Sequence, residues 1–145
     1  MSLWCAMKAP LLIGTDLTIA KKEVLEILGN VEAIAINQDK LGVQAAMVKS
    51  NESVSLIASK PPPAPIPEGP LVWAGPLDNG DSVLALVNQD NNTMPISVDL
   101  ASVFPHAHSF DIRNIWEQTN QSSQSGTVTY SVGPHDTALL RLTPH

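Results

Sequence analysis

The chain has 145 residues and a formal net charge of −6, which is enough for one ordinary core but short of the roughly 250 residues of a complete (β/α)₈ barrel. Its eight Lys and Arg residues form no basic run, and no apolar run approaches the ~20 residues of a membrane-spanning helix, so we expect neither nucleic acid nor a membrane as a partner. Charged residues make up 15% of the chain, against about 25% in typical soluble domains. We therefore expect part of the surface to be covered by a partner or by further chain.

The first 16 residues have the pattern of a helix end followed by a buried strand. Residues 3–7 read as the last turns of a helix, which Pro10 cannot continue. Residues 10–13 then form an apolar run that leads into Gly14, Thr15 and Asp16. This pattern predicts a strand buried on both faces that ends at a polar rim. Since no other run repeats it, the strand is expected to belong to a larger parallel barrel or sheet of which this chain holds a part.

Two helices are predicted next. Residues 18–28 place apolar side chains at 24, 25 and 28 opposite a charged face, which predicts an amphipathic helix ended by Gly29. Residues 31–36 are compatible with a strand because of their β-branched members, or with a short helix capped by Asn30. We favour the helix.

From residue 43 onward the chain changes to short runs with a period of two, separated by turn residues. This pattern predicts an antiparallel β sandwich. The predicted strands are residues 54–58, 71–74, 83–87, 94–100, 110–116, 128–132 and 138–142, and the predicted turns include 78–81, 88–92, 121–126 and 133–136.

A proline-rich stretch at residues 60–70 interrupts these runs, with six prolines in eleven residues. Proline cannot donate to a strand ladder, so we expect a lengthened loop in an extended polyproline conformation. Its two PxxP spacings leave a second interpretation open, a ligand for a domain with an aromatic groove.

Few side chains carry a chemical hypothesis. Asp16 lies where a barrel strand would present a catalytic group, but a cap or loop tie is the favoured role because no second acid lies near it in sequence. His106 and His108, two positions apart, could bind a metal together with His135, but surface histidines are the favoured interpretation because no cysteine or acid joins them at ligand spacing. Trp73 could stack on a sugar together with Trp116, although core packing is the favoured role of both indoles.

The remaining features of chemical interest have structural or conditional meanings. The single Cys5 is expected to be a buried small hydrophobe. Three Asn-x-Ser/Thr sequons, at residues 51–53, 91–93 and 120–122, would accept glycans in a secreted protein. We assign no catalytic, substrate-binding, cofactor or metal residue, and we predict no cofactor.

Several longer motifs carry a family resemblance that covers nearly the whole chain. They are Ser-Leu-Trp-x-x-Met-Lys-Ala-Pro-Leu-Leu-Ile-Gly-x-Asp at 2–16, Leu-Glu-Ile-Leu at 25–28, Ala-Ile-Asn-Gln-Asp-Lys-Leu-Gly-Val-Gln at 35–44, Val-Trp-Ala-Gly-Pro-Leu at 72–77, Asp-Ile-Arg-Asn-Ile-Trp-Glu at 111–117 and Pro-His-Asp-Thr-Ala-Leu-Leu-Arg-Leu-Thr-Pro at 134–144. This order resembles the C-terminal segment of an α-galactosidase (melibiase) of glycoside hydrolase family 27. The proline-rich stretch is the main departure, because relatives usually have a short turn there.

The resemblance implies a mainly β fold, in which a C-terminal antiparallel β sandwich follows the last strand and helices of an incomplete (β/α)₈ barrel. Residues 1–41 would be the barrel portion and residues 42–145 the β domain. The implied reaction is the hydrolysis of terminal α-linked galactose with retention, which needs two aspartates; the positions of both precede the residue that matches Ser2. We therefore expect this chain alone to be inactive, with the galactoside bound through the absent barrel portion.

Three further expectations remain. The resemblance implies a secreted, lysosomal or vacuolar location. Barrel residues left uncovered, which include Leu3, Trp4, Met7 and residues 11–13, would refold against the β domain, become disordered or drive self-association. The alternative function is a non-catalytic β-sandwich module that binds carbohydrate or another subunit.

Overall fold

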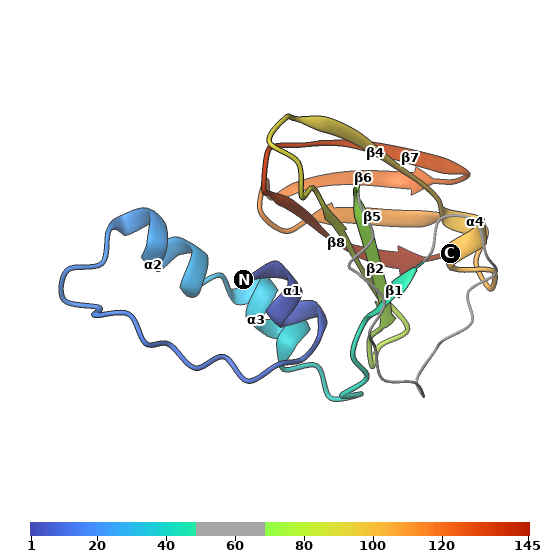
Figure 1. Cartoon of the computed structure of the whole chain (residues 1–145). Helices are drawn as coiled ribbons and strands as arrows, with labels where there is room; N and C mark the ends of the chain where they lie inside the picture. Colours follow the sequence, from blue (N-terminus) through green and yellow to red (C-terminus); the bar gives the residue numbers. More distant parts are fainter. Residues whose placement is uncertain (49–68) are drawn as a thin grey trace, which may run out of the picture.

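The computed structural model describes residues 1–48 and 69–145 (Figure 1). The predicted strand at 54–58, the sequon at Asn51 and residues 60–68 of the predicted proline-rich loop lie outside the described residues. Within them, the helices are α1 (Ser2–Ala6), α2 (Lys22–Leu28), α3 (Val31–Asn37) and α4 (Leu100–Val103). The strands are β1 (Ala46–Val48), β2 (Leu71–Pro76), β3 (Ser82–Val87), β4 (Met94–Asp99), β5 (Phe110–Asn114), β6 (Thr119–Gln124), β7 (Thr127–Val132) and β8 (Thr137–Pro144).

The predicted helix after Asn30 is confirmed. The Asn30 side chain accepts hydrogen bonds from the backbone N–H groups of Glu32 and Ala33, both at 3.0 Å, which satisfies donors that have no partner within the helix. The preceding helix α2 starts at Lys22 rather than at the predicted residue 18. The reason is local, because Asp16 accepts hydrogen bonds from the backbone N–H and the hydroxyl of Thr18 and holds these residues in a turn.

The predicted strand at residues 10–13 is wrong. These residues carry no strand, and Leu12 is 85% exposed where burial on both faces was expected. The Leu12 N–H bonds to the carbonyl of Pro10, two residues back, at 3.1 Å, which is a tight turn rather than a ladder. An apolar run forms a strand only where a neighbouring strand offers its backbone groups, and none of the described strands does so here.

The predicted mainly β, antiparallel sandwich is confirmed. Among residues 1–48 and 69–145, six strands form one sheet in the order β1-β2-β3-β8-β5-β6, and β4 and β7 form a second sheet of two strands. Every pair is antiparallel. Figure 1 shows the β4–β7 ribbon as a separate layer beside the larger sheet, with the three N-terminal helices together at one side.

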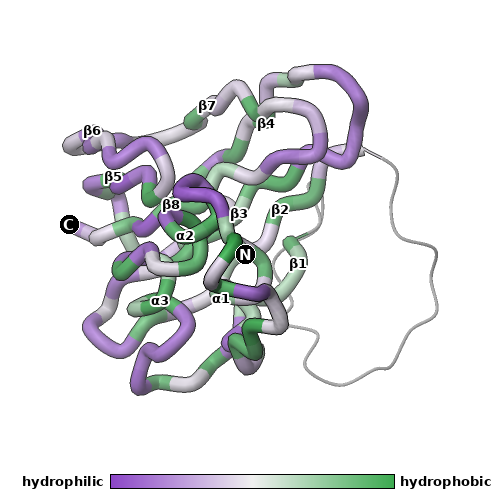
Figure 2. The backbone as a smooth tube through the Cα atoms, turned by 90° about the vertical axis from the view of Figure 1, so that its left-hand side faces the viewer, coloured by the Kyte–Doolittle hydropathy of each residue, from purple (hydrophilic) through white to green (hydrophobic). Residues whose placement is uncertain are grey.

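The larger sheet is buried on both faces at its centre. In β3, Leu84 and Leu86 belong to a first core between the two sheets, while Val83 and Ala85 belong to a second core on the opposite face. The strand is therefore apolar from residue 83 to residue 87, as its green colour in Figure 2 shows. The second core is completed by buried residues from the helices, from strand β8 and from the segments next to the strands: Cys5, Ala6, Ala33, Ile36, Ala45, Leu77, Ile115 and Leu139.

Three further elements test the predicted boundaries. The predicted turn at 78–81 is confirmed as the connection between β2 and β3, and Gly80 adopts the positive φ of 88° that favours glycine there. The predicted turn at 121–126 is wrong in large part, because Thr119–Gln124 form β6. Leu100 was predicted to end a strand but begins α4, since the Asp99 carboxylate accepts the backbone N–H of Ala101 and caps a helical turn.

Candidate functional site

The helical unit, defined as residues 1–41 with α1, α2 and α3, packs on the face of the larger sheet that carries the second core. Helix α1 lies between α3 and strands β2, β3 and β8. The contact is lined by small residues, and Cys5, Ala6, Ala33 and Ala85 are all 0% exposed. Small side chains allow two backbones to approach closely, so the alanines and the cysteine at this contact let α1 and α3 pack close to the sheet.

Hydrogen bonds from two side chains to backbone carbonyls hold α1 and α3 together. The buried Asn37 side chain donates to the carbonyls of Trp4, at 3.1 Å, and Ala9, at 2.8 Å, and so ties α3 to the end of α1. The Lys8 ammonium donates to the carbonyl of Ile36 at the end of α3, and burial lowers the pKa of this lysine. These hydrogen bonds therefore fix α3 against α1 within the helical unit.

A row of four charged side chains, with an acid at each end and two arginines between them, joins the helical unit to the sheet. Arg113 of β5 binds Glu32 of α3 in a bidentate manner, at 3.0 Å from Nε to Oε2 and 2.7 Å from Nη2 to Oε1. Its neighbour across the ladder is Arg141, whose Nε lies 2.5 Å from the buried Asp81 carboxylate. The hydrogen bond from Arg113 lowers the pKa of Glu32, with smaller contributions from the charges of Arg113 and Arg141. This row, which we call the charge row, fixes orientation because bidentate pairs require one geometry.

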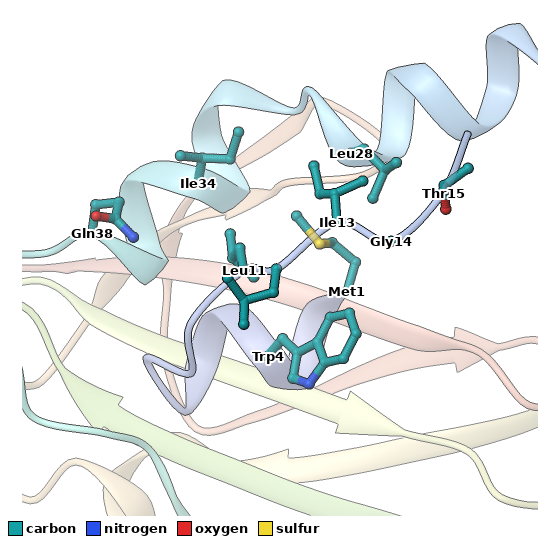
Figure 3. Close-up of a pocket in the computed structure, with 10 residues that line it drawn as sticks. Met1, Trp4, Leu11, Ile13, Gly14, Thr15, Leu28, Ile34 and Gln38 are labelled. Atoms are coloured by element: carbon teal, nitrogen blue, oxygen red, sulfur yellow. The ribbon is translucent and has the colours of Figure 1, made fainter. Parts of the chain in front are cut away.

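An apolar hollow of about 370 Å³ lies on the outer side of the helical unit (Figure 3). It is lined by Met1, Trp4, Leu11, Leu12, Ile13, Gly14, Thr15, Leu28, Ile34 and Gln38. Figure 3 shows Leu11, Ile13 and Met1 pointing toward the space between α1 and α3. Its lining carries no carboxylate, imidazole or thiol, so the hollow suits apolar contact and not acid–base chemistry.

The structure gives Asp16 a local role. Its Oδ1 accepts the Thr18 N–H at 2.9 Å and the Thr18 hydroxyl at 2.6 Å, and the hydroxyl contact is the main cause of its lowered pKa. The side chain is fully exposed, and Asp16 is absent from the lining of the hollow. This is the loop tie favoured from the sequence.

His106, His108 and His135 are all exposed, which is the surface position favoured from the sequence. His106 and His108 lie in the connection between α4 and β5, not on a strand, and both are exposed. His135 instead contacts the Asn91 side chain at 2.8 Å. Across residues 1–48 and 69–145, no group of three His, Cys, Asp or Glu side chains is arranged to hold a metal ion.

Both tryptophans named from the sequence pack against the second core. Trp116 donates its indole N–H to the Ser2 hydroxyl of α1 at 2.9 Å. Trp73 is partly buried against the same core. The packing role favoured over a sugar platform is what the structure has. Cys5 is fully buried, and burial raises the pKa of its thiol.

Comparison with known families decides how this arrangement is classified. The model of the alpha galactosidase C-terminal beta sandwich domain matches residues 68–142, a little over half of the chain. The chain belongs to this domain family. The match covers β2 to β8, which include the strands that carry the charge row and the sheet surface under α1.

Whole-chain relatives of this family member extend the resemblance to the helical unit. The α-galactosidases of Cyamopsis tetragonoloba and Coffea arabica are 31% and 33% identical to it over 144 residues, and the probable α-galactosidase of Dictyostelium discoideum is 38% identical over 151 residues. Each alignment covers 99% of this chain but only 31%, 34% and 34% of the relative, in the same order. The chain thus spans about a third of the length of the relatives that it matches. These relatives are α-galactosidases of the type found in glycoside hydrolase family 27.

Solved structures agree on the fold. The structure of α-galactosidase I from Mortierella vinacea has a TM-score of 0.82 at 23% identity and covers 99% of this chain and 34% of its own. The α-galactosidase from Saccharomyces cerevisiae, solved with raffinose, has a TM-score of 0.76 at 22% identity, with 99% and 42% covered. The coverage includes the helical unit, so the packing of helices on the sheet is part of the shared fold.

Sequence reasoning missed the residues that build the contact between the two parts. No role was assigned to Glu32 from the sequence, and Arg113 was named only as part of a family motif, because the two residues lie 81 positions apart.

Proposed function

We propose that this chain works as the C-terminal part of a retaining α-galactosidase, which removes terminal α-linked galactose from oligosaccharides or glycoconjugates. The observation that carries the proposal is the alignment with α-galactosidases of Cyamopsis tetragonoloba and Coffea arabica along 99% of the chain. The alignment includes the helical unit, which lies outside the matched sandwich domain, and so supports a role tied to the neighbouring catalytic region.

In this proposal, residues 1–41 form the terminal portion of a (β/α)₈ catalytic barrel and residues 42–145 form the β domain. The outer face of the helical unit supports this division, since Leu12, Ile19 and Val31 are 85%, 80% and 77% exposed. Covering such side chains is worth about 1.5–3 kcal/mol each. The hollow would then be filled by apolar side chains from the rest of the barrel.

The proposed contribution of this chain is positional rather than chemical. Retaining hydrolysis needs two carboxyl groups about 5 Å apart, one as nucleophile and one as acid and base. Asp16 is bound to Thr18 and has no such neighbour in the lining of the hollow. The β domain would hold α1 and α3 in place through the second core and the charge row, and the reacting aspartates would be supplied by the remainder of the enzyme.

A chimera tests the proposal directly. The stretch of the Coffea arabica enzyme that aligns with this chain is replaced by residues 1–145, and galactose release from an aryl α-galactoside is measured. We expect turnover from the chimera and none from the isolated chain. A chimera that unfolds cooperatively but releases no galactose would contradict the proposal, as would turnover by the isolated chain that Asp16→Asn abolishes.

The same exposed apolar face predicts how the isolated chain behaves. We expect it to self-associate through the helical unit, because water-exposed apolar side chains of this size favour association. Size-exclusion chromatography with light scattering at increasing concentration measures this, and the double variant Leu12→Gln, Ile19→Gln should shift the chain toward a monomer. The alternative function, a carbohydrate-binding module, has less support because Trp73 and Trp116 are partly buried against the second core.

A further inference from the structure

A polar turn between β3 and β4 presents the sequon Asn91-Asn92-Thr93. Its three residues are all exposed, and in Figure 2 the turn is the hydrophilic segment that leads into β4. Neither the sandwich fold nor the proposed function uses these side chains. We propose that Asn91 is a site of N-linked glycosylation, which goes beyond the proposed function and is independent of it.

The turn is held by the buried Asn88 side chain beneath it, while the sequon side chains lie on the exposed side. The buried Asn88 amide donates to the carbonyls of Asn92, Val132 and Gly133 at 2.8, 3.0 and 2.8 Å. The Asn88 side-chain oxygen accepts the Asp90 N–H at 2.8 Å. These bonds fix the backbone of the turn, so the conformation does not depend on the outward side chains.

The geometry at Asn91 leaves the reacting atom unused. Its Oδ1 contacts His135 Nε2 at 2.8 Å, while its Nδ2 has no hydrogen bond to any residue in the described parts of the chain. Glycosylation replaces one hydrogen on Nδ2 and leaves Oδ1 in place. The contact with His135 and the backbone bonds of the turn are therefore retained in the modified protein.

The modification itself is a group transfer from a polyprenyl-pyrophosphate-linked oligosaccharide, catalysed by the oligosaccharyltransferase of the secretory pathway. A bond forms between Asn91 Nδ2 and the anomeric carbon of the first sugar. The bond between that carbon and the pyrophosphate oxygen breaks, the lipid pyrophosphate leaves with the electron pair, and the amide loses one proton to a base. The Thr93 hydroxyl completes the acceptor motif.

The second described sequon has a different environment. Asn120 lies in β6 directly opposite Arg113 of β5, and its Oδ1 lies 3.5 Å from Arg113 Nη1. A glycan on Asn120 would therefore stand beside the ion pair between Arg113 and Glu32. Asn91 contacts His135 instead, and no ion pair among the described residues involves this turn, which is why we assign the site to Asn91.

The test isolates the Asn91 sequon. The full chain is given a cleavable secretory leader and translated with endoplasmic-reticulum microsomes, in a background that carries Asn51→Gln and Asn120→Gln. We expect a gel-mobility shift of one glycan that peptide-N-glycosidase removes, leaving aspartate at position 91 in the mass spectrum. The shift should be lost on adding Asn91→Gln or Thr93→Ala.

Asn92→Gln is the matched control, because it changes the neighbouring asparagine but preserves the sequon, and it should retain the shift. A background chain whose leader is cleaved but which shows no shift would overturn the assignment. So would a shift that persists in the Asn91→Gln variant.

Discussion

Replacing Ala33 by leucine tests whether the helical unit and the β domain form one packed body. Ala33 is 0% exposed in the second core, between the rest of α3 and the α1 surface. The leucine side chain cannot be accommodated without moving α3 away from α1, and such overpacking costs about 1–3 kcal/mol. Movement of α3 would also disturb the bidentate pair between Glu32 and Arg113.

The same helix offers a matched control. Ala35 lies two positions further along α3 and is exposed, and leucine and alanine differ little in helix propensity. Ala35→Leu should therefore leave stability within about 0.5 kcal/mol of the parent. The two variants differ in the contact made by the side chain and not in the chemistry of the substitution.

Urea unfolding followed by tryptophan fluorescence measures the effect, because Trp116 reports on the contact with Ser2. With a slope of about 2 kcal/mol per M, a loss of about 2 kcal/mol lowers the midpoint by about 1 M. A midpoint for Ala33→Leu equal to that of Ala35→Leu would refute the view that α3 is packed into a common core. A separate early transition confined to Ala33→Leu would instead reveal that the helical unit detaches first.

Three further predictions concern the backbone, a buried amide and the charge row. Gly75→Ala should lower the midpoint of thermal unfolding, because a Cβ there would lie 2.7 Å from a backbone carbon of the segment before β1. Gly14→Ala is the control and should leave the midpoint unchanged, because no atom lies within 4 Å of its added Cβ. Equal midpoints for the two variants would contradict the close approach of β2 to the segment before β1. Asn88→Asp should lower the free energy of unfolding by about 2–4 kcal/mol at neutral pH, since a carboxylate would face three carbonyls in place of three donated hydrogen bonds. This loss of stability should shrink as the pH falls and the introduced acid becomes protonated. A loss in urea unfolding that does not change with pH would count against the prediction. Because the pKa of Glu32 is lowered in the folded state, its contribution to the free energy of unfolding is present above the unfolded-state pKa of about 4.3 and is lost as the pH falls through the lower folded-state pKa. Glu32→Gln should therefore flatten the dependence of stability on pH in the acid range. An unchanged slope in that range would show that Arg113 does not hold the carboxylate in solution.

The features that local sequence fixed in advance are those whose causes lie within a few residues. Asn30 can cap α3 because its side chain reaches N–H groups two and three positions away. Gly80 indicates the hairpin between β2 and β3 because the turn needs a positive φ at that position, which glycine adopts whatever lies elsewhere in the chain. Alternating Ile96 and Val98 predict a half-buried strand whichever strand pairs with it.

Tertiary structure decided what depends on a distant partner. Residues 10–13 have the composition of a buried strand, yet without a neighbouring ladder they remain an exposed connection. β6 has no apolar alternation and exists because β5 offers it an edge with which to pair.

The candidate site shows the same division. The family motifs in the sequence indicated a place beside a catalytic barrel, but only the fold joined Glu32 to Arg113 and revealed which helix face is packed and which is open. Sequence patterns indicate which side chains of a segment are buried, whereas the surface against which they pack is determined by the fold of the whole chain.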